Sequence, residues 1–598
     1  MRTPAQNPAR ARKASVASFP SPTDGWISNQ NLSAEGSGKA GATVLDNWWP
    51  TPQNVMIRRG QQMYCQVPGG SDVHTLMSYS NGGALSLIAG IGTSFWDATD
   101  QNNPMEVVSG LSDTPWSWTQ FATTGGVFLV AVNGKNSLQL FDGSHWWPIG
   151  HSDILQVTLT SSAKDFIAGE AATGATSGAT MSVLYQFGNA LYGTAISGTF
   201  KSGETITGSS GGSVVASADS STWWAGITGN ETSNFSAVFV YMDRLFFIEK
   251  NSLNLWYLTI DSIGGVATIF PMAGVFTGGG SLMFGAGWSL DNSGQGGLSE
   301  QCAIFTDAGE VAIYQGVDPS LSTSWAKVGQ YRIDKPRGPR AFVRNGGDIL
   351  VATDTGLLPL SQAIQKSFAQ LAPASVSYPI DYDWNQYVQS RSGRTWEMTI
   401  WPENQMLIVA LPNSPGEENV CLVANMRTGA WARFTNWFAH CLVVHEGQLY
   451  LGADDGSIIA AWQTGADMGV PYTASFVPLF SAGPAGAVVK LPRDARLMMR
   501  GAAPVSPKLT MQFDYVLSLP TGAQASIPSR GNRWDVGVWD QAVWSGGAQQ
   551  VAQNVWVPVA GRGAAFAPCL QVTSGDTIPL DNELVSIDVT YVAGGLLS

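Results

Sequence analysis

The sequence predicts an all-β protein: an irregular β-propeller of about six blades, with an inserted small β-domain and a C-terminal β-sandwich-like domain. Three observations lead to this prediction. Helical periodicity is almost absent, and only residues 361–370 have the pattern of a short helix. Apolar runs of about four to eight residues alternate with turns rich in Gly, Asn and Asp. The chain has 68 Gly and 23 Trp but only 13% charged residues, which suits short strands and tight turns.

The strand-like runs recur in groups with the order strand, tight turn, strand, turn, strand. One group covers residues 440–445, 448–453 and 457–462, with the turn Asp454-Asp455-Gly456 before its last strand. A small antiparallel sheet of this kind cannot bury both faces alone, so such sheets stack around an axis as propeller blades. Six or seven groups can be counted, and we favour six blades. A string of β-sandwiches is the structural alternative.

Changes in residue composition along the chain predict five segments. Residues 1–22 form a basic arm, with four basic residues before the first acid, Asp24. We interpret this arm as a disordered tail or as a segment that docks on an acidic neighbouring subunit. The other segments are the N-terminal motif with the first blades in 23–151, a Gly-, Ser- and Thr-rich inserted β-domain in 152–222, the remaining blades in 223–465 and a C-terminal β-domain, serving as platform or channel, in 466–598. In the last segment Val585, Ile587, Val589 and Tyr591 alternate with polar residues, as in a half-buried strand.

The net charge and the cysteine content limit the classes of function that the sequence is compatible with. A net charge of −13 argues against a general nucleic-acid binder but suits the wall of a channel that must repel DNA phosphates. The five cysteines are far apart and form no CxxC pair, so we expect reduced, buried thiols. No run of about 18 or more apolar residues occurs, and the N-terminus lacks the apolar stretch of a secretory signal.

Pairs of acids are the first candidates for catalysis, since glycosidases use two carboxylates about 5–10 Å apart. The pairs are Asp97 and Asp100, Asp381 and Asp383, and Asp454 and Asp455. All lie in turn-like contexts, where Asp side chains accept hydrogen bonds from their own backbone. Gly208-Ser209-Ser210-Gly211-Gly212 has the composition of a turn. No Gly-x-Ser-x-Gly segment lies between a predicted strand and a predicted helix, and the chain has no Gly-x-x-x-x-Gly-Lys-Ser/Thr phosphate loop.

Aromatic and histidine pairs give weaker signals. Tryptophan pairs occur at Trp48-Trp49, Trp146-Trp147 and Trp223-Trp224. We interpret them as plugs of blade ends or interfaces rather than as sugar-stacking platforms. His440 and His445 lie five apart on a strand, hence on opposite faces, which disfavours a shared metal. We therefore predict no catalytic, cofactor-binding or metal-binding residues.

The opening segment carries the most specific pattern. It contains Asp24-Gly25-Trp26-Ile27, Asn31-Leu32, Gly38-Lys39-Ala40, Val44-Leu45-Asp46-Asn47-Trp48-Trp49-Pro50 and Val55-Met56-Ile57-Arg58-Arg59-Gly60. This pattern resembles the opening segment of the tail nozzle, or tail tubular, proteins of short-tailed bacteriophages. In that family the segment precedes a propeller. The insertion at residues 174–207 and the closing residues 585–595 resemble the same family.

The resemblance implies a non-enzymatic structural protein of the virion. Six copies would form a ring below the portal and its adaptor, retaining packaged DNA and conducting it during ejection. The implied partners are portal-adaptor proteins, tail fibre, spike or needle proteins, and double-stranded DNA that passes without sequence-specific binding. The implied location is the phage tail, after synthesis in the host bacterial cytoplasm. The alternative is a polysaccharide-binding or polysaccharide-degrading component of a tail fibre or spike.

The opening motif also permits structural expectations. We expect a chain-redirecting turn at Asp46-Asn47, and Trp48 and Trp49 packed against the first blade. Arg58 and Arg59 would pair with acids of a neighbouring subunit or of the propeller rim, and Gly60 would permit a positive φ.

Overall fold

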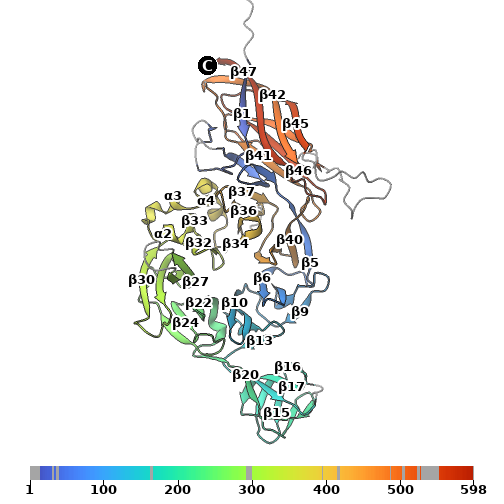
Figure 1. Cartoon of the computed structure of the whole chain (residues 1–598), viewed down its shortest axis with the longest axis vertical. Helices are drawn as coiled ribbons and strands as arrows, with labels where there is room; N and C mark the ends of the chain where they lie inside the picture. The colour runs from blue at the N-terminus through green and yellow to red at the C-terminus, as the bar shows by residue number, and fades with distance from the viewer. Residues whose placement is uncertain are drawn as a thin grey trace, which may run out of the picture. The chain divides into compact units, whose positions relative to one another are not determined.

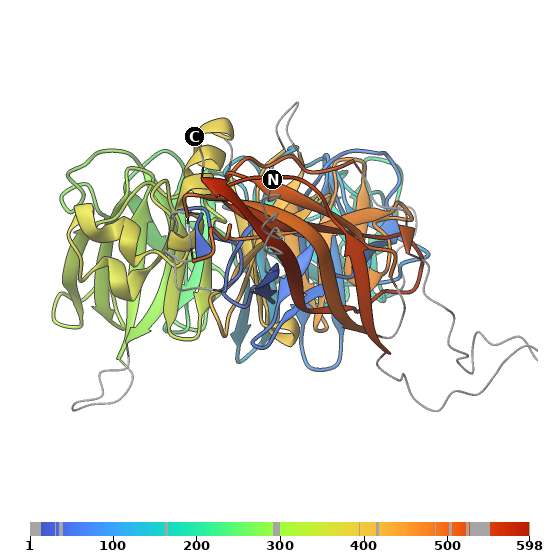
Figure 2. The same cartoon turned by 90° about the horizontal axis from the view of Figure 1, so that it is seen from above.

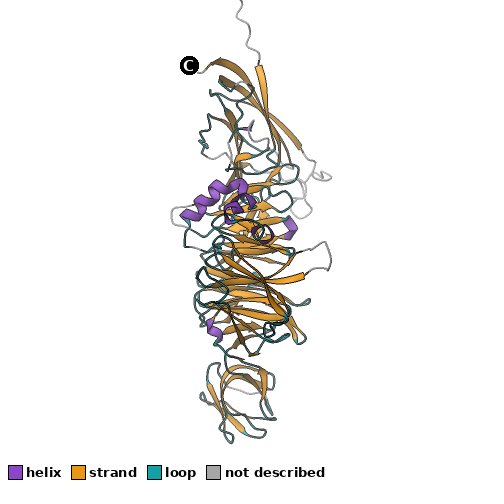
Figure 3. Cartoon of the chain, turned by 90° about the vertical axis from the view of Figure 1, so that its left-hand side faces the viewer, coloured by secondary structure: helices purple, strands orange, loops and turns teal. Residues whose placement is uncertain are grey.

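The structure is a computed structural model of the whole chain. It describes residues 14–29, 32–34, 40–161, 166–290, 299–393, 395–413, 418–484, 486–501, 505–521, 525–526 and 551–596. These residues form an irregular β-propeller with an inserted β-domain and a C-terminal β-domain, as predicted, and strands dominate Figure 3. The chain divides into two compact units. The first comprises Met1–Val73, Ala341–Val343 and Leu350–Ser598, and the second His74–Arg340 and Arg344–Ile349.

Four antiparallel sheets, each of four strands, follow one another in chain order in the second unit (Figure 1). They are β6 (Val73–Ser80), β7 (Leu85–Ile91), β8 (Ser94–Asp97) and β9 (Met105–Val108); β10 (Ser117–Thr123), β11 (Gly126–Val132), β12 (Leu138–Phe141) and β13 (Trp146–Ile149); β22 (Phe235–Tyr241), β23 (Arg244–Glu249), β24 (Asn254–Tyr257) and β26 (Thr268–Pro271); and β27 (Leu282–Leu290), β28 (Ser299–Thr306), β29 (Glu310–Gly316) and β30 (Trp325–Arg332). Two shorter strands, β21 (Ile227–Thr228) and β25 (Gly265–Val266), pair in parallel.

Consecutive sheets among these four share buried cores. Tyr79 and Phe95 of the first sheet pack with Phe141 and Trp146 of the second. Trp147, the neighbour of Trp146 on β13, points into a different core shared with the third sheet, because successive strand residues face opposite ways. Burial on both faces explains why the strands read as continuous apolar runs.

The inserted domain is one seven-stranded sheet with a core of its own. Its strand order is β19-β18-β15-β16-β17-β14-β20. The strands are β14 (Ile154–Thr158), β15 (Ala171–Gly174), β16 (Thr180–Phe187), β17 (Ala190–Ser197), β18 (Thr205–Gly208), β19 (Ser213–Val215) and β20 (Ser221–Trp224). Val157, Met181, Leu191 and Ile206 are wholly buried in its core. The domain therefore begins and ends within two residues of the span 152–222.

Two glutamates organise the turns of this domain in a reciprocal way. Glu204 accepts hydrogen bonds from the backbone N–H groups of Thr176 and Ser177, in the turn after β15. Glu170 accepts one from the N–H of Ser210, in the turn after β18. The Gly-Glu pattern therefore occurs twice, and each copy closes the turn of the other.

Three further blade-type sheets follow in the chain. The sheet β31–β33 has residues in both units, and the other two lie in the first unit. The strands are β31 (Phe342–Asn345), β32 (Asp348–Ala352) and β33 (Leu357–Pro359); β34 (Glu397–Trp401), β35 (Met406–Ala410), β36 (Val420–Asn425) and β37 (Trp431–Thr435); and β38 (Cys441–His445), β39 (Gln448–Gly452) and β40 (Ser457–Thr464) with β5 (Gly60–Gln66). The described residues thus contain seven such sheets, the upper value of the six or seven counted in the sequence.

Strand β5 completes the last of these sheets by pairing antiparallel with β40, Ser457 lying opposite Gln66. A strand from the N-terminal part of the chain thereby covers an edge that would otherwise expose unpaired backbone groups. The opening segment was expected to belong with the first blades in residues 23–151. Instead β5 belongs to the last blade, and the first blade begins at β6.

The C-terminal β-domain consists of two facing groups of strands. One sheet has the order β3-β4-β47-β42-β45, with β1 also on β47; the other includes β2, β41, β46 and β43 and continues into the blade β34–β37. Strands β47, β42 and β45, in orange and red, lie side by side in Figure 2. Their bounds are β1 (Ala14–Pro20), β2 (Ala42–Asp46), β3 (Trp48–Pro50), β4 (Val55–Ile57), β41 (Tyr472–Pro478), β42 (Val488–Gly501), β43 (Lys508–Phe513), β44 (Ala525–Ser526), β45 (Val551–Pro558), β46 (Phe566–Ser574) and β47 (Glu583–Leu596). Phe566 of β46 packs against Phe19 of β1 and Tyr591 of β47.

Two expectations about this domain need correction. Part of the supposed N-terminal arm, Ala14–Pro20, is a strand paired with β47 of the same chain, whereas residues 1–13 lie outside the described residues. The alternation of β47 holds for Ile587, Val589 and Tyr591, which are buried, but Val585 is 45% exposed. The register between β42 and β47 shifts at this point, and such a β-bulge reverses the alternation of side chains.

The helices of the described residues are short, and most of them lie between Leu360 and Ser390. The single helix expected at residues 361–370 is instead a series: α2 (Leu360–Ala363), η2 (Phe368–Gln370), α3 (Leu371–Ala374), η3 (Tyr378–Ile380) and α4 (Asp381–Ser390). Two isolated 3-10 turns occur elsewhere, η1 (Thr232–Asn234) and η4 (Pro402–Asn404). Among the helices of the described residues, none is long and apolar enough to cross a bilayer.

Candidate functional site

The opening motif joins a propeller blade to the C-terminal β-domain. Strand β2 lies between β37 of the blade, to which it runs parallel, and β41 of the C-terminal domain, to which it runs antiparallel. Asp46, at the end of β2, lies opposite Arg433 of β37. The motif therefore forms a seam within the first unit, and its polar residues make the contacts of that seam.

Asn47 forms the predicted turn between β2 and β3. Its φ is 62°, in the left-handed region that Asn tolerates better than most residues. Its buried side-chain amide donates to the hydroxyl of Thr435, at 2.7 Å, and to the carbonyl of Thr473, at 2.8 Å. Its Oδ1 accepts from the N–H of Thr435, at 3.0 Å, and from Nε of Arg58, at 2.8 Å. The side chain thus connects β37, β41 and the segment after β4.

Arg58 is wholly buried, and its guanidinium group has partners on all sides. It donates to both carboxylate oxygens of Asp467, at 2.9 and 2.6 Å, and to the carbonyl of Thr435, at 2.9 Å. Its guanidinium carbon lies 4.0 Å from the ring centroid of Tyr472. Burial acts to lower the pKa of Arg58, but the Asp467 carboxylate more than offsets this, so the pKa is raised and the residue stays charged. The acid partner lies in the same chain, not in a neighbouring subunit.

A second arginine, Arg433, is partly buried and holds the other end of the seam. Arg433 donates to both oxygens of Asp46, each at 2.7 Å, and to the hydroxyl of Tyr387 on α4, at 3.3 Å. Burial acts to lower the pKa of Arg433, yet Asp46 raises it well above its ordinary value. Nearby, burial raises the pKa of Asp383 and of Glu418 despite the opposing effect of Arg433.

Arg59 and Gly60 differ from their expected roles. Arg59 pairs with Asp581 of the same chain through two bonds of 2.8 Å, and both side chains are partly exposed. Gly60 does not adopt a positive φ. A Cβ at this position would lie 2.1 Å from the carbonyl oxygen of Ala466, so the glycine is required by a close backbone approach.

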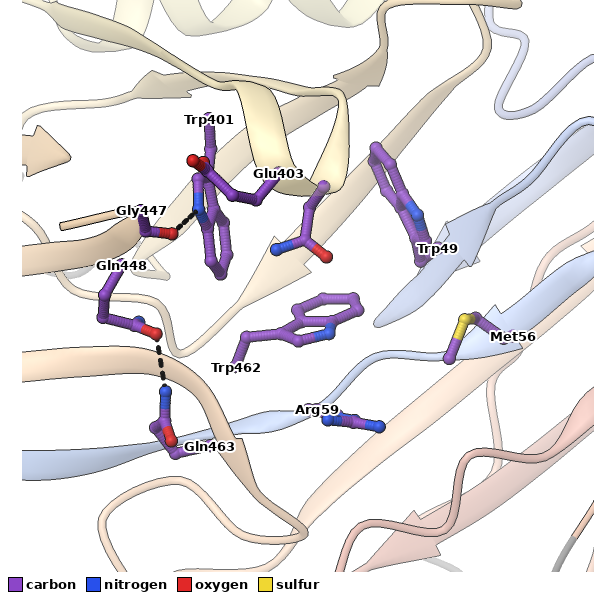
Figure 4. A pocket seen from close by; sticks show the side chains of 10 residues that line it. Trp49, Met56, Arg59, Trp401, Glu403, Gly447, Gln448, Trp462 and Gln463 are labelled. Atoms are coloured by element: carbon purple, nitrogen blue, oxygen red, sulfur yellow. Dashed lines mark hydrogen bonds between the residues drawn. The ribbon is translucent and has the colours of Figure 1, made fainter.

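Trp48 and Trp49 are buried, but not against the first blade. Trp49 contacts Phe434 of β37 and Trp462 of β40, with ring centroids 6.3 and 6.4 Å apart. Together with Trp401, at the end of β34, Trp49 and Trp462 line a cavity of about 520 Å³, which we call the tryptophan pocket (Figure 4). Its lining is completed by Met56, Arg59, Glu403, Asn404, Gly447, Gln448 and Gln463.

The other two tryptophan pairs differ in how deeply they are buried. Trp146 and Trp147 are buried in the cores between sheets, which confirms their interpretation as structural plugs. Trp223 of the inserted domain is 39% exposed. Trp224 beside it packs edge-on against Phe128 of β11.

The acid pairs lie in turns and at the start of a helix. Asp97 and Asp100 accept hydrogen bonds from the N–H groups of Thr99 and Asn102, and Asp455 from that of Ser457, as expected for turns. Asp381 and Asp383 lie in the first turn of α4 rather than in a loop, where a carboxylate suits the positive end of the helix dipole.

Histidine, cysteine and acidic side chains are the residue types that metal and thiol chemistry would use. Within the described part of the chain, no group of three or more His, Cys, Asp and Glu side chains is placed to hold a metal. All five cysteines are buried, as predicted. Burial raises the pKa of Cys421 to about 12 and that of Cys569 to about 11, so these thiols stay protonated. Burial also lowers the pKa of His445.

Sequence reasoning missed the partners of the motif. Asp467, Arg433 and Thr435 carried no local signal, because they lie hundreds of residues from the motif. Trp462 and Trp401 stood at the ends of apolar runs, which gave no indication that they share a cavity.

Comparison with protein-family models found no match, and comparison with curated protein sequences found none either. Solved structures of several proteins match part of this chain at low identity. Sqt1 of Saccharomyces cerevisiae has 12% identity and a TM-score of 0.33, covering 68% of this chain and 99% of its own. YCF48 from Cyanidioschyzon merolae has 8% identity and a TM-score of 0.27, covering 67% and 98%. A quinoprotein alcohol dehydrogenase-like protein from Bacteroides thetaiotaomicron has 9% identity and a TM-score of 0.30, covering 62% and 68%.

Proposed function

We propose that this chain is a non-enzymatic structural protein of a short-tailed phage tail, a nozzle subunit that assembles into a ring of six. The observation that carries the proposal is the role of the opening motif. Asp46, Asn47 and Arg58 are fully engaged in joining a blade to the C-terminal β-domain. A motif used in this way specifies an architecture rather than a reaction, which is what the resemblance to nozzle proteins implies.

An uncovered sheet face supports assembly into a ring. On β1, β47, β42 and β45, one row runs through Ser18, Asp588, Arg496 and Trp556. Trp556 is 57% exposed, and Val16, on the next row, is 64% exposed. Ser18 donates to Asp588 at 2.7 Å, and Arg496 lies 5.9 Å from the Trp556 ring. Large exposed apolar side chains beside ordered polar ones are typical of interface cores.

A ring of identical copies requires heterologous contacts that close by rotation. In the proposed assembly this face covers a different surface of the next subunit, and the ring attaches below the portal adaptor, with fibre, spike or needle proteins as further partners. DNA passes through the lumen without sequence-specific binding. The net charge of −13 suits such a lumen, because like charge keeps the phosphates from adhering.

Particle size and shape in solution test the proposal. Sedimentation of the full chain should give a particle about six times the 63.4 kDa subunit, and negative stain should show rings with a central hole. A chain that remains monomeric at high concentration and cleaves polysaccharide would refute it.

A further inference from the structure

The tryptophan pocket is made of three indoles from three separate strands. Trp49 comes from β3, Trp401 from the end of β34 and Trp462 from β40, and they face one cavity (Figure 4). Its volume of about 520 Å³ lies within the range of about 300–1,000 Å³ that small-molecule sites occupy. Trp49 and Trp401 are only 5% and 3% exposed, so the partly exposed indole of Trp462 supplies the flat apolar face on which a ring-shaped ligand can stack.

These indoles are held in place before any ligand arrives. Nε1 of Trp401 donates to the carbonyl of Gly447 at 2.7 Å. Trp462 stacks on Phe434 with an interplanar angle of 26°, and Trp49 packs edge-on against both rings. A ligand would therefore bind without the cost of ordering these side chains.

Trp462 also has a backbone conformation that points to a function. Its φ is 64°, in the left-handed region that a bulky aromatic residue rarely adopts. Strain of this kind persists where the surrounding structure imposes it, and it gathers at binding sites. Here the conformation accompanies an indole that lines the cavity.

The rim of the pocket supplies polar groups suited to hydroxyls. Glu403, Asn404, Gln448 and Gln463 line it, and Nε2 of Gln463 donates to Oε1 of Gln448 at 2.7 Å (Figure 4). The Nε2 groups of Gln448 and Gln463 already donate within the protein, so these amides and the Glu403 carboxylate offer acceptor oxygens to the hydroxyls of a ligand. A ligand with an apolar ring face and a hydroxyl edge satisfies both parts of the pocket.

The charge of the pocket selects among such ligands. Arg59 is already paired with Asp581 through two bonds of 2.8 Å. Glu403 therefore leaves the pocket with a net negative charge, which disfavours anionic ligands. From this arrangement we propose that the tryptophan pocket binds a neutral pyranose sugar, as part of an oligosaccharide chain. This site is independent of ring assembly.

Isothermal titration of the full chain with maltohexaose, chitohexaose and hexagalacturonate tests the proposal. Wild-type protein should bind at least one of the two neutral oligosaccharides, and the acidic one at least tenfold more weakly. Gln463→Ala, at the exposed rim, should weaken binding at least fivefold, and Trp462→Ala should abolish it. Trp223→Ala, a partly exposed tryptophan of the inserted domain, is the matched control and should bind like wild type.

Several outcomes would overturn the proposal. They are no binding of either neutral oligosaccharide by wild type, tighter binding of hexagalacturonate, or binding that Gln463→Ala leaves unchanged in a protein with wild-type melting temperature. Capture of a hexalysine peptide without any sugar would assign the pocket to a protein partner instead. Sedimentation of the same samples keeps this test separate from ring assembly.

Discussion

The guanidinium of Arg58 meets the carboxylate of Asp467 through two hydrogen bonds, in a site where the arginine side chain has no solvent exposure. The two residues are 409 positions apart in the chain. Arg58 follows the short strands of the opening motif, whereas Asp467 lies between the last blade and the C-terminal β-domain. The pair therefore fastens the opening motif to the segment that joins the last blade to the C-terminal β-domain.

Arg58→Ala is expected to destabilise the first unit by about 3–5 kcal/mol, because it leaves Asp467 as an uncompensated buried charge. Arg58→Lys should recover little, since an ammonium group cannot reproduce the two-point contact. Urea denaturation monitored by tryptophan fluorescence measures both losses. The control is Arg59→Ala, whose half-exposed pair with Asp581 should contribute only about 0–1 kcal/mol. Equal losses at the two positions would contradict this account of the seam.

Gly60→Ala is expected to cost about 1–3 kcal/mol, as overpacking usually does, because the new Cβ would collide with the backbone of Ala466. Gly70 offers a comparison: its φ is 61°, but a Cβ added there would have no atom within 4 Å. Gly70→Ala should therefore show only the smaller penalty of the left-handed conformation, about 1 kcal/mol. The melting temperatures of the two variants distinguish the two effects. A larger decrease for Gly60→Ala than for Gly70→Ala indicates a steric collision rather than a backbone conformational preference.

Ionisation of Asp383 should lower the free energy of unfolding as the pH rises. Burial raises its pKa in the folded state, so the folded chain holds this proton more tightly than the unfolded chain does. The penalty for ionising it is absent below its ordinary value of about 4 and develops above it. Asp383→Asn should therefore raise the melting temperature at pH 7 and leave it unchanged at about pH 3.5. A larger gain at the acidic pH would show that the sign is wrong.

Glu204 should behave in the opposite sense. Burial acts to raise its pKa, but hydrogen bonds from the N–H groups of Ser177 and Lys201 lower it. Its contribution to stability is therefore present above its ordinary pKa and lost as pH falls through the lowered value. Glu204→Gln should destabilise the inserted domain at neutral pH and match wild type in strong acid. Hydrogen exchange of the backbone N–H groups of Thr176 and Ser177 would report the loss locally.

The sequence predicted those features of the fold that are local. Apolar runs between glycine-rich turns identified the blades, the inserted domain and the C-terminal β-domain, because strand and turn preferences act within a few residues. Helix α4 was missed because only Trp384 among its ten residues is buried, which leaves no amphipathic pattern. The exposure of Val585 was missed because a bulge depends on the partner strand β42.

Only part of the candidate site could be predicted from the sequence. The opening motif showed which residues matter, and the turn at Asn47 followed from its chemistry. The partners Asp467, Arg433 and Thr435 could not be inferred, because ion pairs across some 400 residues are set by topology rather than by spacing. The same holds for the tryptophan pocket, whose three indoles meet only once β5 has paired with β40 and β3 has reached Phe434.

Sedimentation velocity of Trp556→Asp beside wild type tests the central claim, that this chain builds a ring through its exposed C-terminal sheet. Wild type should sediment as a closed particle of about six subunits, and the variant as a monomer with an unchanged melting temperature, because Trp556 lies on an outer face. A variant that still forms the same particle, or a wild-type chain that never leaves the monomeric state, would contradict the account.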